Sequence, residues 1–132
     1  RYVFLFKRAG DVYSIDEKLL MAVAHKESTF NAGAVSRFGA LGMMQIMPAT
    51  GARYGLSNQQ LLDPKVSISV GAMILSERIA AYGGDVVKGL SAYKQGSVTV
   101  SRGTYSTSYA SRVLSAHAGV NNFLATNGFV AK

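Results

Sequence analysis

Apolar residues recur every three or four positions along most of this chain, and that spacing places them on one face of a helix. The pattern predicts helices over about residues 2–13, 17–28, 48–54, 64–82, 86–94 and 106–127. Three of them follow an aspartate that can cap a helix N-terminus, namely Asp16, Asp63 and Asp85. The apolar positions of the first, fourth and last helices are Phe4, Leu5, Val12 and Tyr13, then Ile68, Ala72, Leu75, Ile79 and Tyr82, then Tyr109, Val113, Ala116, Val120 and Phe123 or Leu124.

Two segments break this helical pattern. Residues 31–47 contain three glycines and no long helical repeat, which predicts a loop with at most a short β-hairpin that crosses a cleft. Residues 97–108 are rich in Ser, Thr and Gly, and the alternation of Val98 and Val100 predicts a little strand. We therefore expect residues 1–132 to form a single, mainly helical domain.

The composition limits the classes of partner and chemistry. Apolar residues make up 48% of the 132 positions and charged residues 16%, which is typical of a globular protein. The net charge of +7 favours an anionic partner, such as nucleic acid, a membrane surface or a cell-wall polymer. There is no cysteine, which excludes disulfides, thiolate metal sites and a cysteine nucleophile. No apolar run approaches the ~20 residues that span a bilayer. The chain begins with Arg1 instead of Met and shows no export signal, so we expect an excised or processed product.

Glu27 is the candidate catalytic residue. Leu20, Val23 and Ala24 precede it by seven, four and three positions, which puts this acid on an apolar helix stripe. Desolvation favours the protonated form of a carboxyl group, which is the form that a general acid needs. The other six acids are predicted to be helix caps, to lie near helix ends or, for Glu77, to face solvent. A glycosidase with the usual pair of carboxylates is therefore hard to assemble, and a single-acid mechanism fits better.

Other residues suggest little further chemistry. His25 and His117 belong to no metal-binding spacing, and no serine-nucleophile or phosphate-loop motif occurs, so we expect no metal and no cofactor. Met43, Met44 and Met47 could fill the core or provide a flexible apolar contact for a ligand.

The motifs around Glu27 resemble a known family. Its signature is similar to Glu27-Ser28, Asn31, Ala34-Val35-Ser36 and Gly39-Ala40-x-Gly42-Met43-Met44-Gln45-Ile46-Met47-Pro48-x-Thr50. Weaker similarity continues through Asp63-Pro64, Ile68, Gly71, Gly83-Gly84-Asp85, Ala92-Tyr93, Tyr109 and Val113. On these residues the chain resembles lytic transglycosylases of the soluble (Slt) type, which have a lysozyme-like fold related to goose-type lysozyme. Four positions depart from the usual pattern: Met43 replaces Leu, Lys94 and Ser67 replace Asn, and Tyr105 replaces Glu.

The resemblance implies cleavage of the β-1,4 bond between N-acetylmuramic acid and N-acetylglucosamine in peptidoglycan, with formation of a 1,6-anhydromuramic end. Glu27 would act first as the acid and then as the base. The implied supporting residues are Tyr93, hydrogen-bonded to Glu27, and Ser36 nearby. The implied substrate-binding residues are Gln45, Met44, Met43, Tyr109 and Lys94, and the implied structural residues are Ser28 and Gly42. The expected partner is a peptidoglycan glycan strand in the cell envelope or reached from a virion, and the domain is expected to be monomeric, alone or within a larger protein.

Three alternatives to this function stay open. A goose-lysozyme-like hydrolase would use water as the nucleophile, and a catalytically weak wall-binding module would keep only the fold, an option that Lys94 favours. A nucleic-acid binder is the least favoured, because the basic residues form no stripe and no recognition motif is present.

Overall fold

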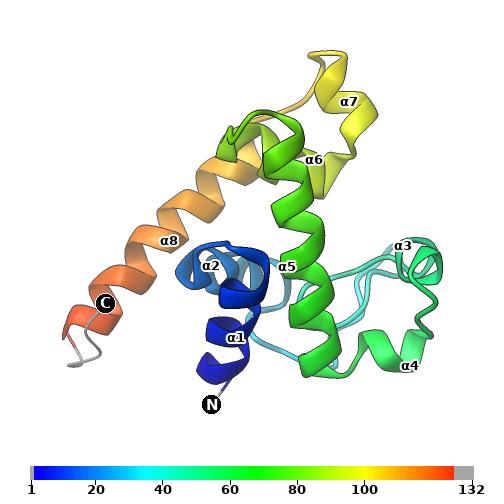
Figure 1. The fold of residues 1–132 in the computed structure, drawn as a ribbon, viewed down its shortest axis with the longest axis vertical. Helices are drawn as coiled ribbons and strands as arrows, with labels where there is room; N and C mark the ends of the chain where they lie inside the picture. Colours follow the sequence, from blue (N-terminus) through cyan, green and yellow to red (C-terminus); the bar gives the residue numbers. More distant parts are fainter. Residues whose placement is uncertain (1, 127–132) are drawn as a thin grey trace.

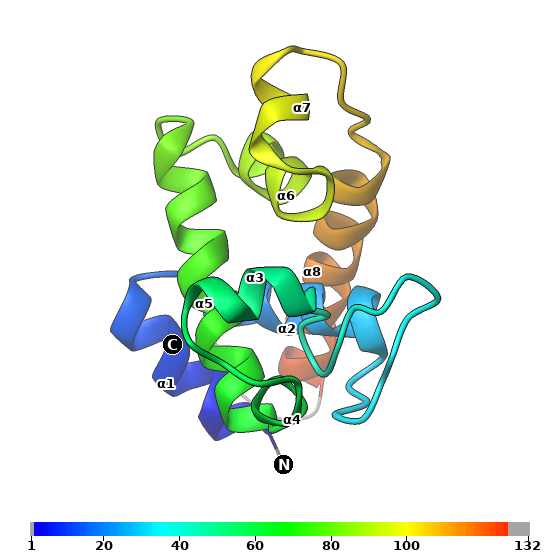
Figure 2. The same ribbon diagram turned by 90° about the vertical axis from the view of Figure 1, so that its right-hand side faces the viewer.

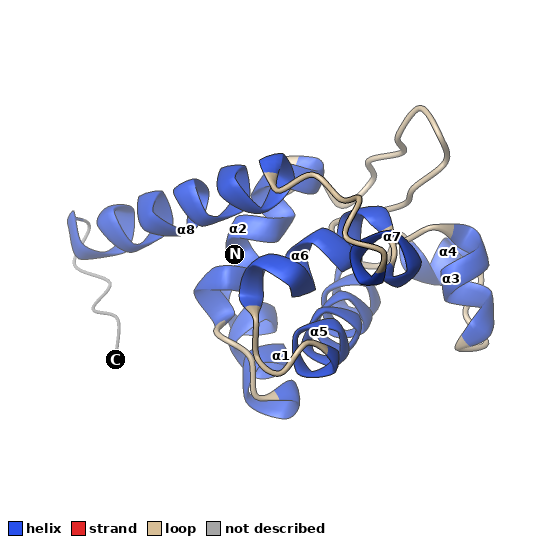
Figure 3. Ribbon diagram, turned by 90° about the horizontal axis from the view of Figure 1, so that it is seen from above, coloured by secondary structure: helices blue, strands red, loops and turns tan. Residues whose placement is uncertain are grey.

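The computed structural model describes the backbone of residues 2–126 and the side chains of residues 2–118. The fold of this part is helical, and its only β pairing consists of isolated bridges from Leu41 to Val35 and to Ile46 (Figure 3). The mainly helical prediction is therefore confirmed. The helices are α1 (Val3–Tyr13), α2 (Glu17–Ser28), α3 (Pro48–Arg53), α4 (Asn58–Leu61), α5 (Pro64–Ala81), α6 (Val86–Gln95), α7 (Ser97–Ser101) and α8 (Ser108–Thr126) (Figure 1).

The helices pack mainly around α5 and α2. The long helix α5 contacts α1, α4 and α6, while α2 packs between α1 and α8, and α8 also reaches α6 (Figure 1). Figure 2 shows the loop of residues 31–47 in cyan, projecting on the same side of the molecule as α3. The C-terminal end of α2 contacts this loop, α6 and α8.

The predicted helix starts are confirmed at all three aspartates. Asp16, Asp63 and Asp85 each accept a hydrogen bond from a backbone N–H in the first turn of the helix that follows. Such a cap satisfies a donor that the helix itself leaves unpaired. The short helix α4 was not predicted, although Ser57 and Gln60 form a reciprocal capping box at its start.

The predicted strand at residues 97–108 is wrong, because residues 97–101 form helix α7. Val100 is buried and Val98 is 66% exposed. Two residues that are two positions apart point in nearly opposite directions on a helix as well as on a strand. A single alternating pair therefore cannot distinguish the two structures.

The predicted apolar face of α1 is partly wrong. Phe4 and Val12 are exposed, whereas Phe6, Ala9 and Gly10 are buried. A Cβ atom at Gly10 would lie 2.7 Å from the carbonyl oxygen of Ile15, so this glycine allows the turn after α1 to fold back closely. On α8, Tyr109 and Val113 are buried as predicted, whereas the side chains of Val120, Phe123 and Leu124 and the predicted helix end at 127–128 lie outside the described residues.

The segment of residues 31–47 is an irregular loop, as predicted. Leu41 and Ile46 exchange two backbone hydrogen bonds of 2.9 and 3.0 Å, and the N–H of Gly42 donates to the carbonyl of Ala34.

In the described part of the chain, no helix combines the length and the apolar character that a membrane crossing requires.

Candidate active site

Glu27 lies in the last turn of α2, on the buried stripe that the sequence predicts. Leu20, Val23 and Ala24 on the same stripe are fully buried. The side chain of Glu27 is only 5% exposed. A carboxylate in this position needs polar partners, because an unpaired buried charge is strongly destabilising.

The chain reverses direction directly after this turn. Thr29 and Phe30 both adopt the left-handed conformation, with φ of 52° and 61°. Each costs on the order of 1–2 kcal/mol for a non-glycine residue. The Phe30 ring packs edge-on against Phe6, with 6.2 Å between the ring centroids, and lies 5.6 Å from the ring of His25. These ring contacts help to hold the reversal that brings the 31–47 loop beside Glu27.

Ser28 joins this loop to α2. Its buried hydroxyl lies 2.8 Å from the carbonyl oxygen of Met43 and 3.1 Å from that of Ala24, so one hydrogen is shared between the two acceptors. These contacts connect the last turn of α2 to the loop.

The next peptide of the loop is held on both sides. The N–H of Met44 donates to the hydroxyl of Ser67 on α5 at 3.0 Å, and the Met44 carbonyl accepts from the Tyr93 hydroxyl at 2.8 Å. Tyr93 was expected to donate to Glu27, but its hydroxyl hydrogen is used on this backbone carbonyl instead. Burial, and then the nearby Glu27 charge, raise the pKa of Tyr93 well above its ordinary value.

Two of the predicted substrate contacts in the loop point into the core, and the third, Gln45, is only partly buried. The side chains of Met43 and Met44 are fully buried, so both methionines belong to the core. The Gln45 amide donates to the carbonyl oxygens of Ala34 and Gly42, at 3.2 and 2.9 Å, and therefore braces the loop internally. Of the two roles open for Met43 and Met44 from the sequence, the structure shows core packing, and the glycan contact of Gln45 stays a prediction.

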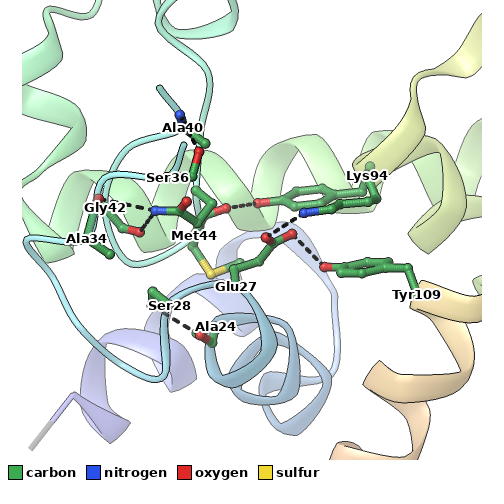
Figure 4. Close-up of polar contacts among 12 residues, drawn as sticks. Ala24, Glu27, Ser28, Ala34, Ser36, Ala40, Gly42, Met44, Lys94 and Tyr109 are labelled. Carbon is green, nitrogen blue, oxygen red and sulfur yellow. Dashed lines mark hydrogen bonds and ion pairs between the residues drawn. The ribbon is translucent and has the colours of Figure 1, made fainter. Parts of the chain in front are cut away.

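Gly42 and Ser36 also maintain the shape of the loop. Gly42 has φ of +79°, and a Cβ atom there would lie 2.3 Å from the carbonyl oxygen of Leu61. Ser36 accepts a hydrogen bond from the N–H of Ala40 at 2.9 Å. Figure 4 draws no interaction between Ser36 and Glu27, so the supporting role of Ser36 stays a prediction.

Two side chains do converge on Glu27. The Tyr109 hydroxyl of α8 donates to Oε2 at 2.8 Å, and the Lys94 ammonium of α6 lies 3.3 Å from Oε1 (Figure 4). Lys94 also lies 5.5 Å from the centroid of the Tyr109 ring, within the range of a cation–π contact. Burial, followed by the Glu27 charge, raises the pKa of Tyr109 far above its ordinary value. Tyr109 therefore remains a hydrogen-bond donor to the carboxylate at any physiological pH.

The resulting cluster contains one carboxylate, one phenol and one ammonium group. Among the described residues, none of the other six acids shares a hydrogen bond or ion pair with it, and no group of three or more His, Cys, Asp or Glu could hold a metal. A buried carboxyl group with two donors can transfer a proton and later accept one. The arrangement suits acid–base chemistry by a single residue.

Comparison with known proteins gives this cluster a context. A model of the Transglycosylase SLT domain family matches residues 4–112. The transglycosylase of Enterobacteria phage PRD1 is 37% identical over 106 residues, which cover 80% of this chain and 39% of that protein. The membrane-bound lytic murein transglycosylase C of Edwardsiella ictaluri is 36% identical over 85 residues, which cover 58% of this chain and 24% of that protein.

A solved structure extends the similarity to the fold. The lytic transglycosylase Slt of Pseudomonas aeruginosa, determined as an inactive Glu-to-Gln mutant, superposes with a TM-score of 0.79 at 26% identity. The match covers 91% of this chain and 24% of that one. This chain thus spans less than half the length of each of these three relatives.

Proposed function

Because this chain belongs to the Transglycosylase SLT domain family, we propose that it cleaves peptidoglycan as a lytic transglycosylase with Glu27 as its catalytic residue. One observation carries the assignment of the residue: Glu27 is a nearly buried carboxylate that two donors hold and that no second acid joins. The relative from P. aeruginosa, which is inactive as a Glu-to-Gln mutant, supports a glutamate in this role. The relatives named for murein cleavage support the substrate.

The reaction follows from a single carboxyl group. Protonated Glu27 gives its proton to the oxygen of the β-1,4 bond, and the bond between that oxygen and C1 of the muramic residue breaks. The acetamido oxygen of the same sugar stabilises the positive charge at C1. Glu27, now a carboxylate, removes the proton from the C6 hydroxyl, whose oxygen attacks C1 to close the 1,6-anhydro ring. Glu27 ends the cycle protonated, so one residue serves as acid and base.

Tyr109 assists the second half of this cycle. Its hydroxyl keeps Glu27 Oε2 in place and stabilises the negative charge between the two proton transfers.

The loop of residues 31–47 carries no carboxylate of its own, and its backbone is fixed by Ser28, Ser67 and Tyr93. We infer that this bracing keeps the glycan-facing edge of the loop at a constant distance from Glu27.

Glu27→Gln tests the assignment of the residue. The exposed Glu77 gives a matched control, because Glu77→Gln removes the same charge from the surface of α5. We expect Glu27→Gln to lower the rate of peptidoglycan solubilisation by at least ~100-fold, which is the range for loss of a general acid, and Glu77→Gln to act as the wild type. A Glu27→Gln variant as fast as the wild type would show that Glu27 is not the catalytic residue, and no solubilisation by either protein would favour the wall-binding module.

The products separate the transglycosylase from the hydrolase. Mass spectrometry of the released muropeptides should detect 1,6-anhydromuramic ends, which are lighter than reducing ends by one water. Reducing ends alone would favour the goose-lysozyme-like alternative.

Relatives from a phage and from a bacterial membrane-bound enzyme support action at the cell envelope, either from a virion or from within the bacterium.

A further inference from the structure

Lys94 is the exposed member of the Glu27 cluster. Its side chain is 50% exposed, whereas that of Glu27 is 5% exposed. The 3.3 Å separation from Glu27 Oε1 is longer than the 2.7–2.9 Å of a tight charge-assisted hydrogen bond. Lys94 is therefore held loosely and can turn towards solvent without any change in the core.

This contact opposes the first proton transfer. An ammonium group has three donor hydrogens and no acceptor, so it cannot accept a hydrogen carried on Oε1. Tyr109 occupies the other oxygen and also donates to it. A protonated Glu27 must point its O–H at the glycosidic oxygen, and Lys94 beside Oε1 competes with that state. The acid step therefore requires Lys94 to leave Glu27.

The substrate of the proposed function offers a new partner for this ammonium group. Each muramic residue carries a lactyl group on O3, whose carboxyl is free when no peptide is attached. When a stem peptide is attached, the peptide brings carboxylates of its own. An anionic group near the cleaved bond can attract Lys94 just as Glu27 does, because the side chain is half exposed.

We propose that Lys94 exchanges Glu27 for a carboxylate on the muramic O3 substituent, so that binding of an anionic glycan releases the catalytic acid. This inference rests on the proposed function. It makes Lys94 a residue that determines specificity, since a neutral strand would leave the ammonium group on Glu27. Within the described part of the chain, Lys94 is the one basic residue paired with Glu27.

The experiment compares charged and neutralised substrates. Peptide-free glycan strands prepared with an amidase carry lactyl carboxylates, and untreated strands carry stem-peptide carboxylates. Each is also used after its carboxylates are coupled to methylamine with a carbodiimide. Rates of anhydro-end formation are measured for the wild type, Lys94→Asn, Lys94→Arg and Lys88→Asn. Lys88 is exposed on the same helix, so its variant controls for the loss of one positive charge.

We expect neutralisation to lower kcat/KM at least tenfold for the wild type, Lys94→Arg and Lys88→Asn, and less than threefold for Lys94→Asn. A loss confined to peptide-free strands would assign the exchange to the lactyl carboxylate, and a loss confined to untreated strands would assign it to the stem peptide. Equal losses for the wild type and Lys94→Asn would overturn the exchange, as would the absence of any loss, while anhydro ends still formed. Absence of anhydro ends from every wild-type digest would instead overturn the proposed function, and the exchange with it.

Discussion

The Tyr109 hydroxyl donates a 2.8 Å hydrogen bond to Glu27 Oε2 across 82 residues of sequence. At the other end of the same helix pair, His117 Nε2 lies 3.0 Å from Asp16 Oδ2. Helix α8 is thus attached to both ends of α2, in antiparallel orientation (Figure 1). Glu27 therefore gains its hydrogen bond from Tyr109 only when α8 packs on α2.

Removing the Tyr109 hydroxyl should impair catalysis without unfolding the protein. Tyr109→Phe leaves one oxygen of a nearly buried carboxylate without its donor. A hydrogen bond to a charged group contributes about 1.5–3 kcal/mol, so we expect kcat/KM for anhydro-end release to fall about 10- to 100-fold. Circular dichroism should remain that of the wild type.

Tyr54→Phe is the matched control for this variant. The Tyr54 hydroxyl lies 3.5 Å from the exposed Glu77, at the surface. Its loss should leave both the rate and the fold unchanged. If the Tyr109→Phe rate equalled that of the wild type, the 2.8 Å bond would have no part in the reaction.

Tyr93→Phe should lower the stability of the fold more than the activity. Its hydroxyl satisfies the Met44 carbonyl and not Glu27. The variant leaves that acceptor unpaired, so the free energy of unfolding measured in urea should fall by about 1–3 kcal/mol. Activity should fall less than in Tyr109→Phe. Unchanged stability together with an equal loss of activity would mean that Tyr93 acts directly on the acid, as the family resemblance implies.

The resemblance implied that Tyr93 contacts Glu27, whereas in the structure Tyr109 does, and this difference shows what the sequence cannot predict. Capping aspartates and the apolar stripe ahead of Glu27 are local patterns, so the main helices and the burial of the acid were predictable. Which phenol reaches Glu27 depends on how α6 and α8 pack on α2, and no local pattern encodes that packing.

The loop illustrates the same limit at closer range. Its irregular backbone was evident from its glycines, but the full burial of Met43 and Met44 was not. The Met44 peptide is held by Ser67, which accepts from its N–H, and by Tyr93, which donates to its carbonyl, and both residues are distant in sequence. A motif can therefore be identified correctly while the burial of its individual side chains is not.

Gly42→Ala should be far more damaging than Gly39→Ala. Both glycines have positive φ, +79° and +91°, so alanine is strained by about 1–2 kcal/mol at either position. A Cβ atom at Gly42 would also lie 2.3 Å from the Leu61 carbonyl oxygen, whereas at Gly39 no atom lies within 4 Å. We expect urea unfolding to give a loss at Gly42 that exceeds the loss at Gly39 by at least about 1 kcal/mol. Equal losses would show that the backbone around Leu61 moves aside freely.

Asp16→Asn should reveal how much the Asp16–His117 contact stabilises the docked α8. Asparagine caps a helix as well as aspartate does, so the cap is kept and the charge is removed. Burial raises the pKa of Asp16, but the hydrogen bonds from His117 and from the Lys18 N–H outweigh it, and the net pKa lies below the ordinary 3.8.

The lowered pKa sets the pH range of this effect. The contribution of the Asp16 charge is complete above about pH 5 and is lost as the pH falls through the folded-state pKa. Because Asp16 is half exposed, we expect a decrease in unfolding free energy of only about 0.2–1 kcal/mol at pH 6, shrinking towards zero at pH 2. Asp63→Asn is the control, since Asp63 is also an N-cap but pairs with no histidine. A pH-independent difference for Asp16→Asn, or an equal one for Asp63→Asn, would mean that the contact with His117 does not anchor α8.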